Sequence, residues 1–237
     1  MFEVDSLSFS YSGRHVLRNV AFKVAPGEVV AVAGVNGAGK TTLLKCLARV
    51  VVPQAGSVLL DGQDVEMRSL KYFRQLGYLP EKVALYEDMT VKGYLKYRAA
   101  LKGEPTKRIR RRVSEAVERC RLAEVVDRPI RVLSAGLKKR VALADAILLR
   151  PKVLLLDDFL SGVDREFREY AGELLADAAS YSCVIATGHE IEAFSNWAKR
   201  FLVLKSGSVA ADIALAETGK TEAVSMVDCI VKGGSAK

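Results

Sequence analysis

The chain has 237 residues, half of them hydrophobic, and a formal net charge of +8 at pH 7. This length and apolar content are enough for one sizeable core with an inserted subdomain. No apolar run approaches the length of a membrane span, and the N-terminal residues Met1–Asp5 do not have the pattern of a signal peptide. The charge is compatible with an anionic membrane surface, nucleic acid or an acidic partner, and does not choose among them.

The cysteines are scattered along the chain without C-x-x-C spacing. Such a pattern differs from that of a zinc site or a disulfide framework, and it is typical of small core residues in a reducing compartment. We therefore expect a cytosolic protein with free thiols at Cys46, Cys120, Cys183 and Cys229.

The N-terminal part of the chain reads as short strands separated by turns. Turn residues occur at Ser12-Gly13 and Pro26-Gly27. The apolar run that follows the second turn predicts a buried strand. The predicted strands cover about residues 4–9, 16–17, 20–24 and 28–33.

The stretch Gly34–Thr42 fits G-x-x-x-x-G-K-[ST], the phosphate-binding loop, and lies between the buried strand and a helix predicted over residues 42–48. Its glycines allow backbone shapes in which successive N–H groups turn toward an anion. The helix N-terminus adds partial positive charge. We expect Lys40 to reach the β- and γ-phosphates of a nucleotide, and the Thr41 hydroxyl to bind Mg²⁺.

The middle of the chain changes to a charged, helical pattern. Thr90, Thr106 and Ser134 are each predicted to cap a helix, because their side-chain oxygens can accept from the first free N–H groups. We interpret about residues 82–150 as a helical subdomain inserted between core strands. Strands at 57–60 and 76–79 come before these helices, which are predicted over about 91–101, 106–121 and 135–149.

The remaining third alternates between strands and helices, which predicts the α/β class. Its last five residues, 233–237, are small and are expected to be disordered. The predicted elements are strands at 153–156 and 183–187, helices at 165–179 and 190–198, and a hairpin of 201–205 with 208–213.

Two acidic residues end the apolar strand at 153–156. Asp157 stands where P-loop proteins place the aspartate that helps to hold Mg²⁺. Asp158, one residue further on, could orient or deprotonate an attacking water. The alternative is that both acids only cap the following turn.

These motifs, in this order, resemble the ATP-binding subunit of an ABC transporter over about residues 1–213, with residues 214–237 as a C-terminal extension. The resemblance implies an α/β P-loop NTPase fold, with a RecA-like core, an N-terminal antiparallel β subdomain and an inserted helical subdomain. The family's motifs match at Tyr11 (adenine stacking), Gly34–Thr42, Glu81 (the magnesium-sensing position), Leu133–Leu137 (the signature), Asp157-Asp158, Ser161–Asp164 (the partner-contact loop) and His189 (the switch histidine).

The resemblance also implies a role for each matched residue, with ATP and Mg²⁺ as cofactors and two subunits sharing the nucleotides. Within one subunit the nucleotide is expected to contact Tyr11, Asn36, Gly37, Ala38, Gly39, Lys40, Thr41 and Thr42. Ser134, Gly136 and Asp164 are expected to act on the partner subunit's nucleotide. The expected catalytic residues are Asp158, His189 and Lys40, and the expected metal site is formed by Thr41, Asp157 and Glu81.

Several positions depart from the family pattern. Asp158 replaces the usual catalytic glutamate, and a carboxylate set back by roughly 1 Å can cost about a hundredfold in rate. Phe159 replaces the usual proline, and Ala135 and Leu137 change the signature without altering Ser134 or Gly136. Glutamate instead of glutamine at Glu81 is familiar in the ABC-2 exporter branch, which the segment 77–95 also resembles.

We therefore expect an ATPase subunit on the inner face of the cell membrane that powers separate transmembrane permease subunits, as an exporter, with slow hydrolysis. Two alternatives stay open: a soluble ABC-type switch or scaffold, and the degenerate-site partner in a heterodimeric transporter. The ATPase subunits would form a homodimer or a heterodimer.

The basic run Lys107–Arg112 lies on one of the predicted helices. It is either a solvated helix face or a contact for anionic lipid or a cytoplasmic loop. Nucleic acid is the weaker interpretation, because aromatic residues for base stacking are not interleaved and no helix-turn-helix pattern occurs.

Overall fold

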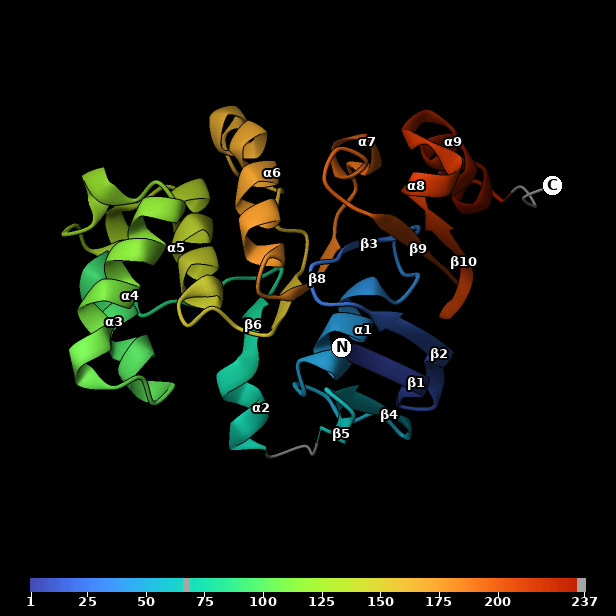
Figure 1. Cartoon of the computed structure of the whole chain (residues 1–237), viewed down its shortest axis with the longest axis horizontal. Coiled ribbons are helices and arrows are strands. Elements are labelled where there is room, and N and C mark those ends of the chain that lie inside the picture. The colour runs from blue at the N-terminus through green and yellow to red at the C-terminus, as the bar shows by residue number, and fades with distance from the viewer. Residues whose placement is uncertain (66–68, 234–237) are drawn as a thin grey trace.

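Two β-sheets and the helices around them form the protein in the computed structural model, which describes residues 1–65 and 69–233 (Figure 1). The central sheet has five parallel strands, and β10 pairs antiparallel with β9 at one edge. Its strand order is β10 (Ser208–Ala214), β9 (Arg200–Lys205), β3 (Val29–Ala33), β8 (Cys183–Thr187), β7 (Val153–Leu156) and β6 (Leu76–Leu79).

The central strands are buried on both faces, as their continuous apolar runs predict. Successive side chains of a strand point to opposite faces of the sheet. The two faces of the central sheet therefore belong to two separate hydrophobic clusters. Val30 and Val32 of β3 pack toward the second sheet. Val29 and Ala31 pack toward the helices of the opposite face.

The second sheet is antiparallel and lies over one face of the first. Helix α1 (Lys40–Leu47) packs between the two sheets, because Leu43, Leu44 and Leu47 share a core cluster with residues of both. The phosphate-binding loop is thereby held at its helical end by buried apolar contacts. The strands of this sheet, in order, are β2 (Arg14–Val24), β1 (Phe2–Tyr11), β4 (Ala55–Leu60) and β5 (Gln63–Asp64).

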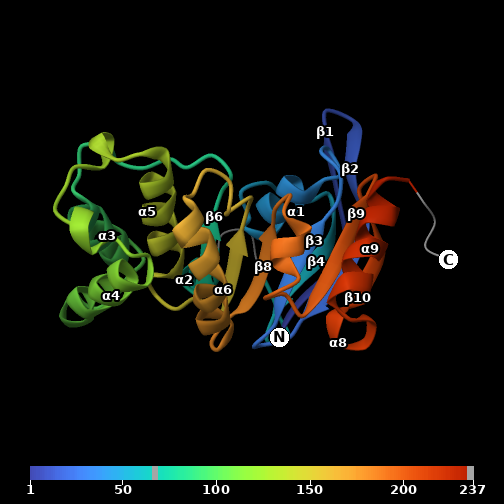
Figure 2. The same cartoon turned by 90° about the horizontal axis from the view of Figure 1, so that it is seen from above.

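Three helices stand together beside the sheets, at the left of Figures 1 and 2: α3 (Val91–Leu101), α4 (Thr106–Arg119) and α5 (Ala135–Ile147). Short 3₁₀ turns at Ala123–Val125 and Ile130–Val132 join α4 to α5. Helix α5 also packs on β6, the edge strand of the central sheet.

A buried ion network holds α3 against α5. The Asp145 carboxylate accepts from Arg98 Nε at 2.9 Å and from Lys102 Nζ at 2.8 Å. All three side chains are largely buried, so each charge depends on the others for compensation.

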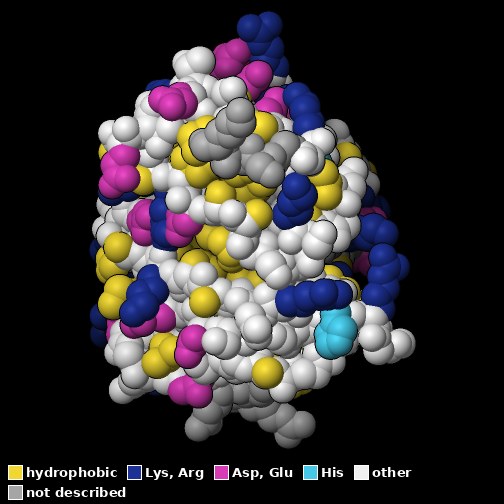
Figure 3. Space-filling model, turned by 90° about the vertical axis from the view of Figure 1, so that its right-hand side faces the viewer, with side chains coloured by type: hydrophobic (Ala, Val, Ile, Leu, Met, Phe, Trp, Pro, Cys, Tyr) yellow, Lys and Arg dark blue, Asp and Glu magenta, His cyan; other side chains and the backbone are white. Residues whose placement is uncertain are grey.

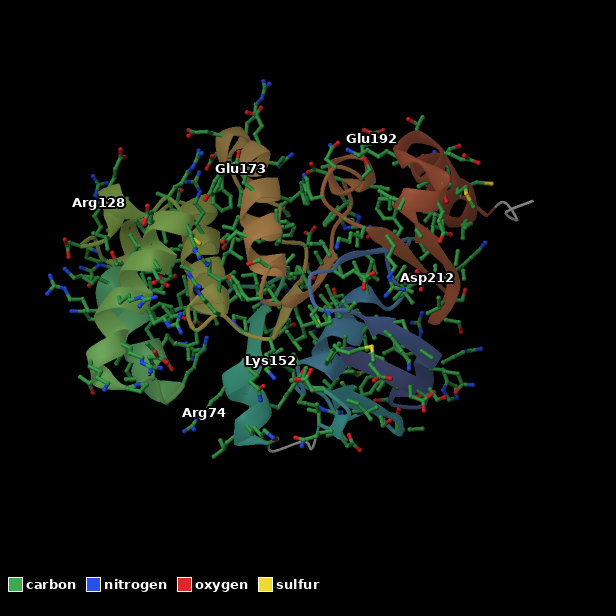
Figure 4. All side chains as sticks on the ribbon, in the orientation of Figure 1. Arg74, Arg128, Lys152, Glu173, Glu192 and Asp212 are labelled. Atoms are coloured by element: carbon green, nitrogen blue, oxygen red, sulfur yellow. The ribbon has the colours of Figure 1, made fainter. Side chains whose placement is uncertain are left out.

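The other helices cover the remaining face of the central sheet. They are α6 (Arg165–Ala179), α7 (Ile191–Phe194), α8 (Leu215–Thr218) and α9 (Lys220–Val231), and α2 (Leu70–Gln75) precedes β6. On the side of α9 and β10, basic and acidic side chains are scattered over the surface (Figure 3). Charged side chains such as Arg128, between α4 and α5, and Glu173, on α6, project outward (Figure 4).

The mixed α/β P-loop fold agrees with the sequence prediction, and most differences concern short elements. Residues 16–24 belong to one strand, because Asn19 takes a positive φ of 47° and the pairing with β1 continues past it. The predicted helix at 190–198 is only Ile191–Phe194. Thr106 begins its helix without capping it, since Pro105 is the N-cap residue. Elements α2, β5, α8 and α9 were not predicted from the sequence.

Residues 234–237, most of the tail predicted to be disordered, lie outside the described residues. Among the helices within 1–65 and 69–233, none combines the length and the apolar character that crossing a bilayer requires.

Replacing Asp145 with alanine is expected to lower the free energy of unfolding by about 3 kcal/mol, because Arg98 and Lys102 keep their buried charges without a partner. The matched control is Asp127→Ala, whose exposed pair with Lys92 spans 3.6 Å and whose loss should cost less than about 1 kcal/mol. Urea denaturation of both variants measures the difference. Equal losses would contradict the assignment of a structural role to the network.

Candidate nucleotide-binding site

The phosphate-binding loop joins β3 to α1 at the carboxyl edge of the central sheet. Gly34 has a φ of 150°, and a Cβ at this position would lie 2.4 Å from the carbonyl oxygen of Leu204. Gly39 has a φ of 107°, and its Cβ would lie 2.9 Å from a methyl group of Leu17. Both glycines are therefore required by close packing as well as by backbone conformation.

Lys40 lies over this loop. Its Nζ donates to the carbonyl oxygens of Gly34 at 2.6 Å and Val35 at 3.1 Å. Burial lowers the pKa of Lys40, while the carboxylates of Asp157 and Asp158 oppose that shift. The loop thus keeps a cation among its own backbone groups, where phosphate oxygens can be bound.

Asp157 follows β7 and collects hydrogen bonds from two other elements. Its Oδ1 accepts from Thr187 Oγ1 at 2.7 Å and from Thr41 Oγ1 at 3.2 Å. Its Oδ2 is buried without a hydrogen-bond partner among the described residues. Burial raises the pKa of Asp157, although the hydrogen bonds from Thr187 and Thr41 oppose that shift.

This arrangement fits a divalent cation. A carboxylate oxygen that is buried and unpaired, beside a threonine hydroxyl, is the hard oxygen environment that Mg²⁺ prefers. Asp157 and Thr41 could therefore hold Mg²⁺, with Glu81 at the rim of the same cleft.

Most of the predicted site residues line one open cleft of about 890 Å³. The cleft also contains a threonine and basic residues that the sequence analysis did not single out. The predicted residues that line it are Tyr11, Asn36, Gly37, Gly39, Lys40, Thr41, Thr42, Glu81, Asp157, Asp158 and His189. The additional residues are Arg14, His15, Val16, Arg18, Thr187, Gly188, Ser206 and Gly207.

Three of these missed positions carried a signal in the sequence. Arg14 and Arg18 follow Tyr11 in the same hairpin, where basic side chains could meet an anion. Thr187 ends a buried strand two residues before His189, and its hydroxyl accepts from the backbone N–H of Asp158 at 3.0 Å. The sequence signal for Thr187 is a polar residue at the end of an apolar strand, where ligands commonly bind in α/β sheets.

Ala38 is not among the residues that line the cleft, although its neighbours Gly37 and Gly39 are, and its contact with the nucleotide stays a prediction. Its side chain is 2% exposed and packs in the core. Its backbone N–H donates to the carbonyl oxygen of Val35 at 3.1 Å. The small apolar side chain of Ala38 packs beneath the phosphate-binding loop, in the core.

Three further predicted residues lie outside the cleft but close to one another. Ser134 is the N-cap of α5 and accepts from the Leu137 N–H at 3.3 Å. Gly136 packs against the next loop, since a Cβ there would lie 2.9 Å from the carbonyl oxygen of Gly162. Asp164 is the N-cap of α6 and pairs with Arg140. They form one surface, which carries two helix N-termini.

A family model described as "ABC transporter" matches residues 17–161, which is more than half of the chain. An uncharacterized ABC transporter ATP-binding protein, YxlF of Bacillus subtilis, is 31% identical over 88% of this chain and 69% of its own length. The Fe(3+) ions import ATP-binding protein FbpC of Photorhabdus laumondii is 31% identical over 87% of this chain. The match spans 59% of FbpC's own length.

Solved structures agree with the sequence comparison. One described as the structure of an ATP-binding subunit of an ABC transporter has a TM-score of 0.85 and 27% identity. The match covers 99% of this chain and 95% of the solved chain. The correspondence therefore includes both sheets and the helices beside them.

Lys40→Ala is expected to weaken ATP binding by about 100-fold or more, because it removes charge-assisted hydrogen bonds to phosphate. Lys45→Ala is the matched control, since Lys45 lies on the same helix but does not line the cleft. Titration with a fluorescent ATP analogue measures both affinities. Unchanged affinity in Lys40→Ala would contradict the assignment of the loop.

Proposed function

Because the chain belongs to the ABC transporter family, we propose that it drives export through separate transmembrane subunits by binding and slowly hydrolysing ATP. The observation that best supports this function is that the chain carries two complementary surfaces. One is the cleft with the phosphate-binding loop, and the other carries Ser134, Gly136 and Asp164 outside that cleft. A second ATPase subunit in head-to-tail orientation would bring each surface to the other's nucleotide.

Within one subunit, the loop N–H groups and Lys40 bind the phosphates and stabilise the charge that develops on the transferred group. Thr41 and Asp157 would hold Mg²⁺, which would neutralise phosphate charge. Asp158 orients the attacking water, and His189, exposed at the rim, hydrogen-bonds the γ-phosphate. Glu81 contributes a further carboxylate beside the metal.

ATP bound between two subunits would hold them closed, and hydrolysis would let them reopen. Such a cycle can move transmembrane subunits between two states, because ATP contacts the closed pair more extensively than the open one. The Ser134 hydroxyl and the first N–H groups of α5 supply the anion-binding part of the opposite surface.

The export direction is proposed from the run Gly77–Glu81 and the following residues, which resemble the ABC-2 exporter branch. FbpC carries an importer's name, so direction does not follow from family membership. We place the protein on the inner face of the cell membrane, as a homodimer or heterodimer of ATPase subunits. The transported substrate would be selected by the transmembrane subunits.

Asp158→Glu is expected to raise the ATP turnover rate by about tenfold to a hundredfold, since one more methylene extends the carboxylate by roughly 1 Å. Asp158 has a positive φ of 46°, so Asp61→Glu, at a φ of 54° and outside the cleft, is the control for backbone strain. Steady-state phosphate release measures turnover. A glutamate variant no faster than the wild type would show that the short carboxylate does not limit hydrolysis.

Membrane association separates transport from a soluble switch. We expect the chain to sediment with membranes of its own cells and to leave them in detergent together with an integral membrane protein. The docked transmembrane subunits would provide this attachment, and mass spectrometry identifies the companion. Recovery solely as a soluble complex would contradict the transport assignment.

A further inference from the structure

Lys139 is a buried lysine on α5 that the proposed mechanism does not use. Its side chain is among the few buried charged groups, with the residue 8% exposed. Its Nζ donates to the backbone carbonyl oxygen of Asp158 at 2.5 Å. An ammonium buried this far is costly unless it is well compensated, so the contact must supply a large part of that compensation. The carboxylates of Asp158, Asp157 and Glu81 supply further negative charge.

The backbone of Asp158 is held at both of its polar groups by other elements. Its N–H donates to Thr187 Oγ1 on β8, and its carbonyl oxygen accepts from Lys139 Nζ on α5. The residue has a positive φ of 46°, in the left-handed region that a side chain makes unfavourable. Such a conformation persists only where the surroundings fix it. Since φ sets the direction of the Cα–Cβ bond, these two hydrogen bonds fix the direction in which the Asp158 carboxylate points.

The segment from Asp158 to Asp164 is attached to α5 at three places. Lys139 holds its beginning, and Gly136 packs against the carbonyl oxygen of Gly162 in its middle. Arg140 pairs with Asp164 at its end. The Arg140 guanidinium also lies 4.5 Å from the centre of the Phe167 ring. Helix α5 and this segment therefore form one packed unit.

We propose that Lys139 is a positioning residue for ATP hydrolysis, which fixes the backbone of Asp158 and connects it to the helix that Ser134 begins. The inference rests on the proposed function, in which Ser134 contacts ATP held by a second subunit. Ser134 precedes Lys139 by five residues on the same rigid helix.

Lys139→Met tests the contact, because methionine fills a similar volume and donates no hydrogen bond. Single-turnover hydrolysis is expected to fall by about tenfold to a hundredfold. The affinity for MgATP should stay within about threefold, because Lys139 does not line the cleft. Lys139→Arg keeps a donor and should recover part of the rate.

Lys138→Met is the matched control. Lys138 is the next residue on α5, and its Nζ contacts Glu87 Oε1 at 2.7 Å instead of Asp158. We expect its single-turnover rate to stay within about twofold of the wild type, since a surface ion pair of this kind contributes little.

The double variant Lys139→Met with Asp158→Asn separates positioning from a structural role. If Lys139 acts through Asp158, the double variant hydrolyses ATP no more slowly than Asp158→Asn alone. Additive losses, a Lys139→Met rate equal to that of the wild type, or a parallel loss of ATP affinity and melting temperature would each overturn the inference. A wild type that neither binds nor hydrolyses ATP overturns the proposed function, and this inference with it.

Discussion

The hydrogen bonds around Asp157 connect the three elements on which the site depends. Thr187 ends β8, Thr41 lies in the first turn of α1, and both donate to the same carboxylate oxygen of Asp157, which follows β7. They can meet because β7 and β8 are parallel neighbours whose carboxyl ends share one edge of the sheet. The second carboxylate oxygen is buried and unpaired among the described residues, which is costly unless a cation binds there. A cation bound at Asp157, as proposed above, would thus link folding to metal binding at one side chain.

Nucleotide binding and hydrolysis rest on different parts of this arrangement. Binding depends on backbone groups that Gly34 and Gly39 bring into position, and the contacts around both glycines are tight. In the proposed function, hydrolysis would depend on Asp158, whose shorter side chain and left-handed backbone make its placement sensitive to its neighbours. A loop can therefore be complete for binding while the acid beside it determines how fast ATP is used.

Much of the fold could be predicted from local pattern. The strands at 29–33, 153–156 and 183–187 are short apolar runs, and they are buried in the structure as such runs require. The caps at Thr90 and Ser134 agree with their side-chain hydrogen bonds. The elements missed, β5, α2 and α8, are two to six residues long, and such lengths show little periodicity. Helix α9 is longer, but its stability comes from packing on β9, which the sequence does not display.

The sequence by itself determined the phosphate-binding loop, the acidic pair and the order of the motifs, because these depend on residue type and spacing along the chain. Only the tertiary structure decided how they meet. It turned Ala38 into the core, brought Thr187 to Asp157, and gave Gly136 a packing role against Gly162. It also carried Lys139 to Asp158, 19 residues away in the chain. Such contacts arise when separate elements pack, and no local pattern encodes which side chains will face each other.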